Sequence, residues 1–169
     1  MLCACALLGA CATSVDRNTP SASGERREGP GPARVIERPV ADLSPGQALA
    51  PSALGMRVRW SGGIQTIEAR EGGRQCFTLL HATFDARQVL QWPRDPQYFV
   101  ACGPGDYDRN LVAPFTLLSI GGRVVGSQQV VGQPVPVIEI EELYRHSDCV
   151  QGSEQSPECY AGELQPERP

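Results

Sequence analysis

The chain has 169 residues, enough for one domain with tails, and its net charge is −4. We expect no nucleic acid among its partners, because a mildly acidic chain without a basic patch cannot neutralise phosphates. No apolar run of about 18 residues follows residue 12, so the sequence predicts no membrane-spanning helix.

The first ten residues, MLCACALLGA, are apolar and carry no charge. A secretory signal peptide has such an apolar region after a basic start. We therefore interpret residues 1–10 as the end of a lipoprotein signal peptide whose start lies upstream. The following stretch, Leu8-Gly9-Ala10-Cys11, resembles the lipobox of bacterial lipoproteins. The alternatives are a buried strand or a chance match, but Ala12, Thr13 and Ser14 open a polar run instead of continuing a core element.

The lipobox resemblance implies that Cys11 becomes the acylated N-terminus, so that membrane lipid is one partner of the protein. The residue after Cys11 is Ala12, whereas an Asp at this position would retain a lipoprotein in the inner membrane. In this respect the sequence resembles lipoproteins sent to the outer membrane. The expected location is the outer membrane, with the domain facing the periplasm.

Residues 11–41 are rich in Pro, Gly, Ser and charged side chains. Such a segment buries too little apolar surface to offset its chain entropy, and we predict a lipidated, disordered tether. The expected folded domain spans residues 42–149, and residues 150–169 form a similar polar tail.

Within the domain the pattern is mainly β. Residues 42–54 favour one short helix, capped by Ser44 before Pro45. The pair Gly62-Gly63 predicts a bulge in a curled strand, and Pro134 and Pro136 predict an edge at the start of the last strand. The predicted strands cover residues 56–69, 76–84, 98–102, 115–125 and 135–144.

Residues 76–84 are apolar on both faces, so a core helix is the alternative there. Five strands and one short helix predict a small, OB-like antiparallel β-barrel, because closure hides the strand edges. Its expected interior includes Val58, Trp60, Leu117 and either Ile138 or Ile140.

Three stretches carry a family resemblance: LGMRVRWSGGIQTIE, RNLVAPFTLLSIGGRVVGSQQVVGQ and PVPVIEIEELYRH. They are similar to Slp-type outer-membrane lipoproteins (the starvation-inducible type) over residues 43–146. This resemblance implies an OB-like barrel on the outer membrane without established catalytic residues. The chain departs from the family in its four further cysteines and in lacking the aromatic-rich C-terminal tail of some members, so no role of that tail is carried over.

Once residues 1–10 are removed and Cys11 is lipidated, four thiols remain, and they allow three pairings. Cys76 begins one predicted strand and Cys102 ends the next, while Cys149 and Cys159 are close in sequence. We expect the disulfides Cys76–Cys102 and Cys149–Cys159. The alternative is a metal site made by His146, Asp148, Cys149 and Cys159, whose spacing matches no zinc pattern, so no metal is expected.

Other candidate sites are weaker. Asp106, Asp108 and Asn110 have the spacing of half a calcium loop, but Leu111 stands where its glycine is required, which favours a polar turn. A Ser-His-Asp triad around His81 has no nucleophile elbow to support it. Trp60 is expected in the core, with ligand stacking at the barrel mouth as the alternative.

These observations favour a non-enzymatic lipoprotein without a cofactor that acts in envelope structure or stress adaptation through contacts with envelope proteins. The alternative is a binding module that holds a small molecule or a glycan at the barrel rim. A hydrolase is the third hypothesis, and a convergent acid–base pair with shifted pKa values in a deep pocket would favour it.

Overall fold

The computed structural model describes residues 39–149 and 156–167. The predicted signal peptide, Cys11 and most of the tether lie outside the described residues. The elements in chain order are η1 (Gln47–Leu49), η2 (Pro51–Ala53), β1 (Arg57–Arg70), β2 (Arg74–Phe84), β3 (Leu90–Gln91), β4 (Tyr98–Pro104), β5 (Leu117–Val130), β6 (Gln133–Arg145), η3 (Pro157–Cys159) and β7 (Gly162–Glu163).

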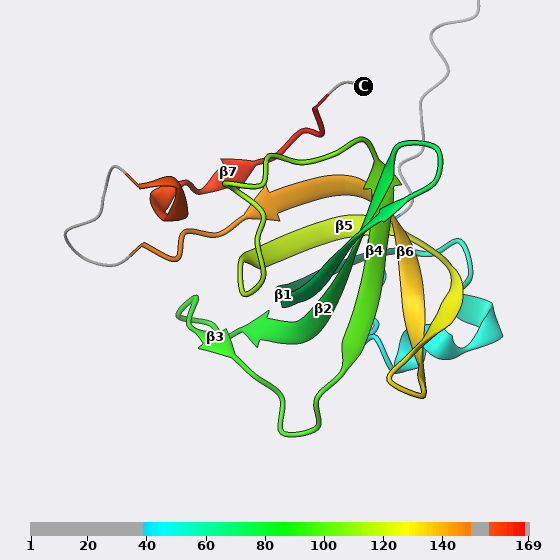
Figure 1. Ribbon diagram of the computed structural model, residues 1–169. Helices are drawn as coiled ribbons and strands as arrows, with labels where there is room; N and C mark the ends of the chain where they lie inside the picture. The colour runs from blue at the N-terminus through cyan, green and yellow to red at the C-terminus, as the bar shows by residue number, and fades with distance from the viewer. Residues whose placement is uncertain (1–38, 150–155, 168–169) are drawn as a thin grey trace, which may run out of the picture. The chain divides into compact units, whose positions relative to one another are not determined.

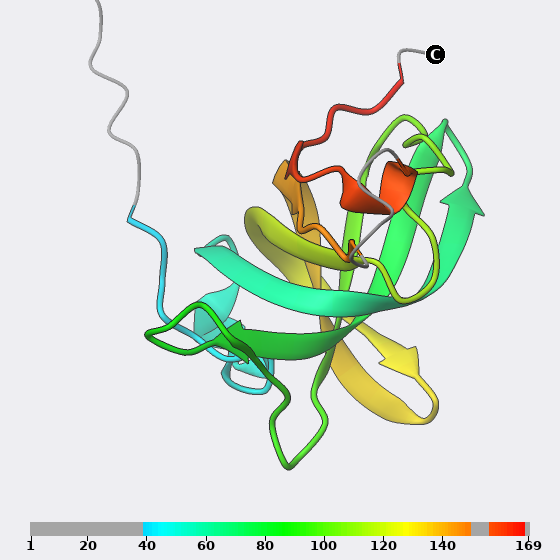
Figure 2. The ribbon, with the colours of Figure 1, turned by 90° about the vertical axis from the view of Figure 1, so that its left-hand side faces the viewer.

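The chain folds into a small OB-like β-barrel, as predicted. The strands follow the order β1-β5-β6-β4-β2, and β1 also pairs with β2, which closes the sheet on itself. Every pairing of the barrel is antiparallel except the short parallel contact of β4 with β6. Figures 1 and 2 show β1 curving around the barrel and the β5–β6 hairpin extending beyond it. None of the helices among the described residues is long and apolar enough to span a membrane.

The strand β1 is able to curl because of its two central glycines. A Cβ on Gly62 would lie 2.5 Å from the carbonyl oxygen of Leu80 on β2, so only glycine allows this approach. The register with β2 then shifts between Ile64 and Thr66, just after the predicted bulge. As a result, residues 57–63 of β1 pair with β5 and residues 61–70 pair with β2, so the strand contacts both partners at residues 61–63.

Residues 76–84 form part of a strand, not the alternative helix, and the predicted helix over residues 42–54 is present only as the two 3₁₀ turns η1 and η2. The N-cap of η1 is Gly46 and not Ser44, but Ser44 still bonds the first residue of η1: its Oγ accepts a hydrogen bond from the Gln47 amide at 3.3 Å and Gln47 Oε1 accepts one from the Ser44 amide at 2.8 Å. Pro51 begins the second turn, and a proline cannot donate the hydrogen bond that would continue the first.

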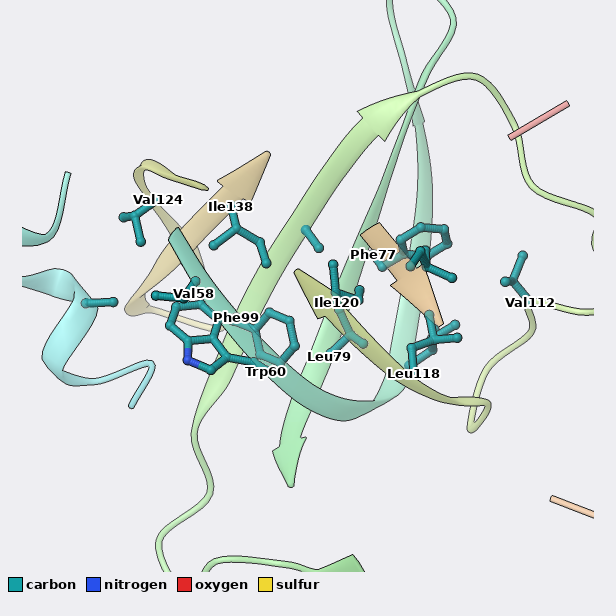
Figure 3. Close-up of a cluster of buried hydrophobic side chains, with 14 of the residues drawn as sticks. Val58, Trp60, Phe77, Leu79, Phe99, Val112, Leu118, Ile120, Val124 and Ile138 are labelled. Carbon is teal, nitrogen blue, oxygen red and sulfur yellow. The ribbon is translucent and has the colours of Figure 1, made fainter. Parts of the chain in front are cut away.

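The barrel interior is filled by side chains, as Figure 3 shows. Trp60 is 4% exposed, its ring stacks edge-on against Phe99 at 5.2 Å, and its indole N–H donates to the Leu43 carbonyl at 2.6 Å. The fully buried aliphatic and aromatic side chains of this core include Val58, Ile64, Phe77, Leu79, Phe99, Leu118, Ile120 and Ile138.

Leu117 is a correction to the predicted interior. It is half-buried on the outer face, whereas Leu118 is fully buried inside. β5 begins with two leucines, and an alternating pattern allows either of them to point into the barrel. The register with β1 decides which one does: Leu117 pairs with Gly63 and lies on the outer face, and Leu118 pairs with Gly62 and lies inside.

The described C-terminal residues belong to the sheet. The strand β7 pairs with β6 at Tyr144 and Arg145, and the Leu164 amide donates to the Leu143 carbonyl at 2.9 Å. Further on, the Glu167 amide donates to the Asp106 carbonyl at 2.7 Å. The folded unit therefore extends past residue 149, where the sequence placed its end.

Candidate ligand-binding groove

A groove of about 620 Å³ lies on the outer face of the barrel, between the β1–β2 hairpin and the β5–β6 hairpin. In an OB-fold the second and third strands and the loops of these two hairpins bind oligonucleotides and oligosaccharides, and here the corresponding strands are β2 and β4. The groove is lined by Gln65, Thr66, Glu68, Arg70, Thr78, Tyr98, Gln128, Gln129, Val130 and Val131.

Pairing of the strands brings the lining residues together. Thr66 of β1 is opposite Thr78 of β2, and Thr78 is opposite Val100 of β4, so these three form a row across the outer face. The amide side chains of Gln128 and Gln129 come from the β5–β6 hairpin on the far side of the groove. Residues more than 60 positions apart in the chain therefore share one site.

The predicted disulfide Cys76–Cys102 is present on this same face. The two cysteines are cross-strand partners of β2 and β4 and form the row beside Thr78 and Val100. Cys76, Val100 and Val135 form a small apolar cluster outside the main core, with Tyr98 and the β5–β6 hairpin packed against it. The disulfide thus fixes the two strands that form the floor of the groove.

Charge within the groove is balanced. Arg70 and Glu68, its two charged lining residues, form an ion pair at 2.5 Å. At the neighbouring end of β2, Arg74 pairs with Glu139 at 2.5 Å, and the pKa of Arg74 is raised, mainly by this hydrogen bond. The remaining polar groups are hydroxyls and amides, which hydrogen-bond uncharged polar ligands.

Trp60 does not lie on the groove or on the barrel rim as a ligand platform. Its ring is in the core and its N–H is bonded within the protein. A shallow hollow of about 520 Å³ touches Trp60 between residues 41–47 and strands β1 and β2.

The structure contains a serine–histidine contact that sequence reasoning missed. Ser119 Oγ lies 2.7 Å from His146 Nε2 and 2.6 Å from Ser61 Oγ. Burial, with a smaller effect of Arg59, lowers the pKa of His146. No carboxylate of the described residues hydrogen-bonds this histidine, and the nearby Asp148 is bound to Arg145 instead, so the contact is not completed to a triad.

The other candidate centres are not assembled either. Burial lowers the pKa of His81, whose ring lies edge-on to Phe99, and among the described residues no serine or aspartate side chain bonds it. The thiols of the alternative metal site are joined in the second predicted disulfide, Cys149–Cys159. In the calcium-like stretch, Asp108 accepts hydrogen bonds from Asn110, as in a polar turn.

Arg145 joins the C-terminal segment to the barrel, and its side chain is almost completely buried. Its Nε donates to the Leu111 carbonyl at 2.8 Å, and its NH2 group donates to Asp148 at 2.7 Å. Another donor reaches the Tyr160 carbonyl, next to the Cys149–Cys159 disulfide. The sequence showed no sign of this arrangement.

No family model and no curated protein matches the chain. A small single-stranded DNA-binding protein from Streptomyces coelicolor is 10% identical, covering 54% of this chain and 93% of its own, with a TM-score of 0.40. The N-terminal domain of PriB from Thermoanaerobacter tencongensis is 10% identical, covering 54% and 97%, with a TM-score of 0.31.

The expectation that the protein has no nucleic-acid partner needs correction. Nucleic acid was excluded as a partner on net charge, yet one structure similar to this chain is a single-stranded DNA-binding protein. That exclusion is corrected, because the net charge of a whole chain does not describe the face that a ligand meets.

Proposed function

We propose that the protein is a non-enzymatic outer-membrane lipoprotein of a Gram-negative envelope that acts by binding, and that the groove holds an uncharged polar ligand, a glycan. The observation that carries the proposal is the groove itself: hydroxyls and amides from four parts of the chain converge over strands that a disulfide joins. The barrel interior is filled, which leaves the outer face for a ligand.

The two disulfides and the lipobox together support the location. Disulfides persist in oxidising compartments such as the periplasm. The sequence around Cys11 and the Slp-like stretches add the expectation of a lipid anchor. Among the described residues, pKa values are shifted at His81, His146, Tyr107 and Arg74, and none of these four lines the groove, which supports binding over catalysis.

Cell fractionation tests the anchor. The protein is expressed in a Gram-negative host behind a complete lipoprotein signal sequence, as wild type and as Cys11→Ser. We expect the wild type in the outer-membrane fraction, with the mass of an acylated chain, and the variant unprocessed or released. Co-fractionation of a correctly processed Cys11→Ser variant with outer membranes would show that the protein is not anchored by a lipid on Cys11.

Titration calorimetry with an uncharged oligosaccharide tests the groove. Soluble oligomers of N-acetylglucosamine are the probe, because their acetamido groups and hydroxyls match the amides of Gln128 and Gln129. The double variant Gln128→Ala, Gln129→Ala should lose binding. Gln165→Ala removes an exposed amide that does not line the groove and should bind as the wild type does. Equal affinity of the wild type and the double variant would refute the groove as the site.

A second candidate function is contact with another envelope protein, in the structural or stress-adaptation role that the sequence analysis favoured. The exposed aliphatic side chains of Val40, Leu54 and Met56 favour it, because they surround a hollow of about 440 Å³ where the described chain begins. In crosslinked envelopes, Leu54→Asp should remove adducts that Gln165→Ala retains. Unchanged adducts in Leu54→Asp would exclude this surface.

A further inference from the structure

Trp92, on the segment between β3 and β4, rests on the outer face of β1. A Cβ built on Gly63 would lie 3.2 Å from the edge of the Trp92 ring, so the glycine provides the space for the indole. Trp92 nevertheless stays 50% exposed. A large aromatic ring held against a sheet with one side open to solvent is a surface on which a ligand can stack.

Phe115 lies beside β1 at Ile64, the residue after Gly63, and is 83% exposed. Its φ is +73°, a conformation that a bulky side chain rarely adopts. A hydrogen bond from its amide to the Ile64 carbonyl, 2.8 Å long, holds it there. An exposed phenylalanine maintained at a conformational cost has no role in the core, and such strain is concentrated at functional sites.

Strand register connects Gly63, the residue under Trp92, to the groove and to the start of β5, which Phe115 precedes by two residues. Gly63 is opposite Leu80, and Leu80 is opposite Tyr98, which lines the groove. On its other side Gly63 is opposite Leu117, two residues after Phe115. One row thus runs across the sheet from Tyr98 to the β5 side.

Gln65 connects the two regions directly. Its side chain lines the groove, and its Nε2 donates to the Gly63 carbonyl at 3.2 Å. The path from Tyr98 on β4 across β2 and β1 to β5 crosses three strand spacings, roughly 14 Å. Including the β5–β6 hairpin, it is longer than a disaccharide.

We propose that the groove continues over Trp92 and Phe115, and that its ligand is a linear glycan strand that crosses the strands and stacks sugar rings on these two side chains. This inference rests on the proposed function of the groove. A pyranose ring offers an apolar C–H face to an aromatic ring and hydroxyls at its edge, which suits alternating aromatic and amide side chains. The paired charges of Glu68 and Arg70 favour a neutral strand over a polyanion.

Chain length is the decisive variable in the test. The di- and hexasaccharides of N-acetylglucosamine are titrated into the wild type, Trp92→Ala, Phe115→Asn and the Gln128→Ala, Gln129→Ala variant. We expect the wild type to bind the hexasaccharide at least tenfold more tightly than the disaccharide. Trp92→Ala and Phe115→Asn should each weaken hexasaccharide binding about three- to tenfold and leave the disaccharide unchanged. Asparagine tolerates a positive φ, so Phe115→Asn removes the ring without adding strain.

Three results would overturn the inference, and they are distinguishable. If the glutamine variant loses binding but Trp92→Ala and Phe115→Asn keep full hexasaccharide affinity, the groove is the binding site but does not extend over these two aromatic residues. If no saccharide binds the wild type, the proposed function itself fails. If a 12-residue oligothymidylate binds instead, loses affinity in Trp92→Ala and weakens with added salt, the polymer is nucleic acid and the glycan assignment is wrong.

Discussion

Cys76 and Cys102 are direct cross-strand partners, with Cα atoms 4.1 Å apart and their sulfur atoms bonded. The bond joins β2 to β4, the two strands whose outer faces form the floor of the groove. Cys102 also takes part in the parallel contact of β4 with β6, where it lies opposite Glu139. The disulfide therefore stabilises the barrel where its closing strands meet and shapes the candidate site beside it.

Removal of this disulfide should destabilise the barrel more than removal of the C-terminal one. In the chain-entropy model the Cys76–Cys102 loop contributes about 3.5 kcal/mol and the shorter Cys149–Cys159 loop about 2.7 kcal/mol. The double variants Cys76→Ala, Cys102→Ala and Cys149→Ala, Cys159→Ala are compared by urea unfolding. A larger loss in the second variant would show that the C-terminal bond does more than close its loop.

Trp60→Ala should cost about 3–5 kcal/mol of unfolding free energy, because the indole fills the interior and leaves a cavity. Trp60→Phe keeps most of the packing against Phe99 but loses the hydrogen bond to Leu43, so its cost should be smaller. Thermal unfolding of both variants measures this. A shift of only a degree or so for Trp60→Ala would contradict the core assignment.

The barrel and both disulfides could be predicted from the sequence. Val58 and Trp60 alternate with arginines, and the turn of residues 71–74 separates two apolar runs, so the strands and their order along the chain follow from local pattern. The Cys76–Cys102 disulfide follows from this, because antiparallel neighbours bring the start of one strand to the end of the next. The Cys149–Cys159 disulfide was predicted from the closeness of the two residues in sequence.

The candidate site could not be predicted in the same way. Thr66, Tyr98 and Gln129 have ordinary strand patterns, and only the closed register brings them to one face. The two-residue strand β7 has no periodicity that a sequence could reveal. The strained φ of Phe115 depends on its bond to Ile64, which is a tertiary contact.

Arg145→Met should release the described C-terminal segment from the barrel. The substitution keeps an apolar stem but leaves the carbonyls of Leu111 and Tyr160 without their donor, and each unsatisfied group costs about 1–3 kcal/mol. Hydrogen exchange should then increase at Leu164 and Glu167 before it increases in the barrel strands. Arg123→Met, a surface arginine paired with Glu141, is the control. Unchanged protection at Leu164 would contradict this role of Arg145.

Stability should decline on mild acidification through the two histidines. The pKa values of His81 and His146 are lowered in the folded protein, mainly by burial, so below about pH 6.5 the unfolded chain binds more protons than the folded one. The histidine contribution is complete above the unfolded pKa and is lost as the pH falls toward the folded values. Urea unfolding at pH 7.5, 6.5 and 5.5 should show a smaller decline in the His81→Asn, His146→Gln double variant. An equal decline in the wild type and the double variant would mean that protonation of carboxylates, and not of these histidines, lowers the stability.

Val131 and Gly132 form the two-residue connection of the β5–β6 hairpin, and both have positive φ, at +48° and +77°. Such a turn prefers Asn-Gly, because a β-branched residue is strained in this conformation by about 1–2 kcal/mol. Val131 is 99% exposed, so its side chain contributes almost no burial in return, yet it lines the groove. Its position at the groove fits a ligand contact maintained at a cost in stability.

Val131→Asn should therefore raise the free energy of unfolding by about 1 kcal/mol while weakening binding of the hexasaccharide. Val125→Asn is the matched control: this valine of β5 is also exposed but has no positive φ, so the same substitution should lower stability through lost strand propensity. Thermal unfolding and calorimetry on the same samples give both quantities. Should Val131→Asn be no more stable than the wild type, the turn carries no strain; should it be more stable and bind equally well, the valine is not a ligand contact.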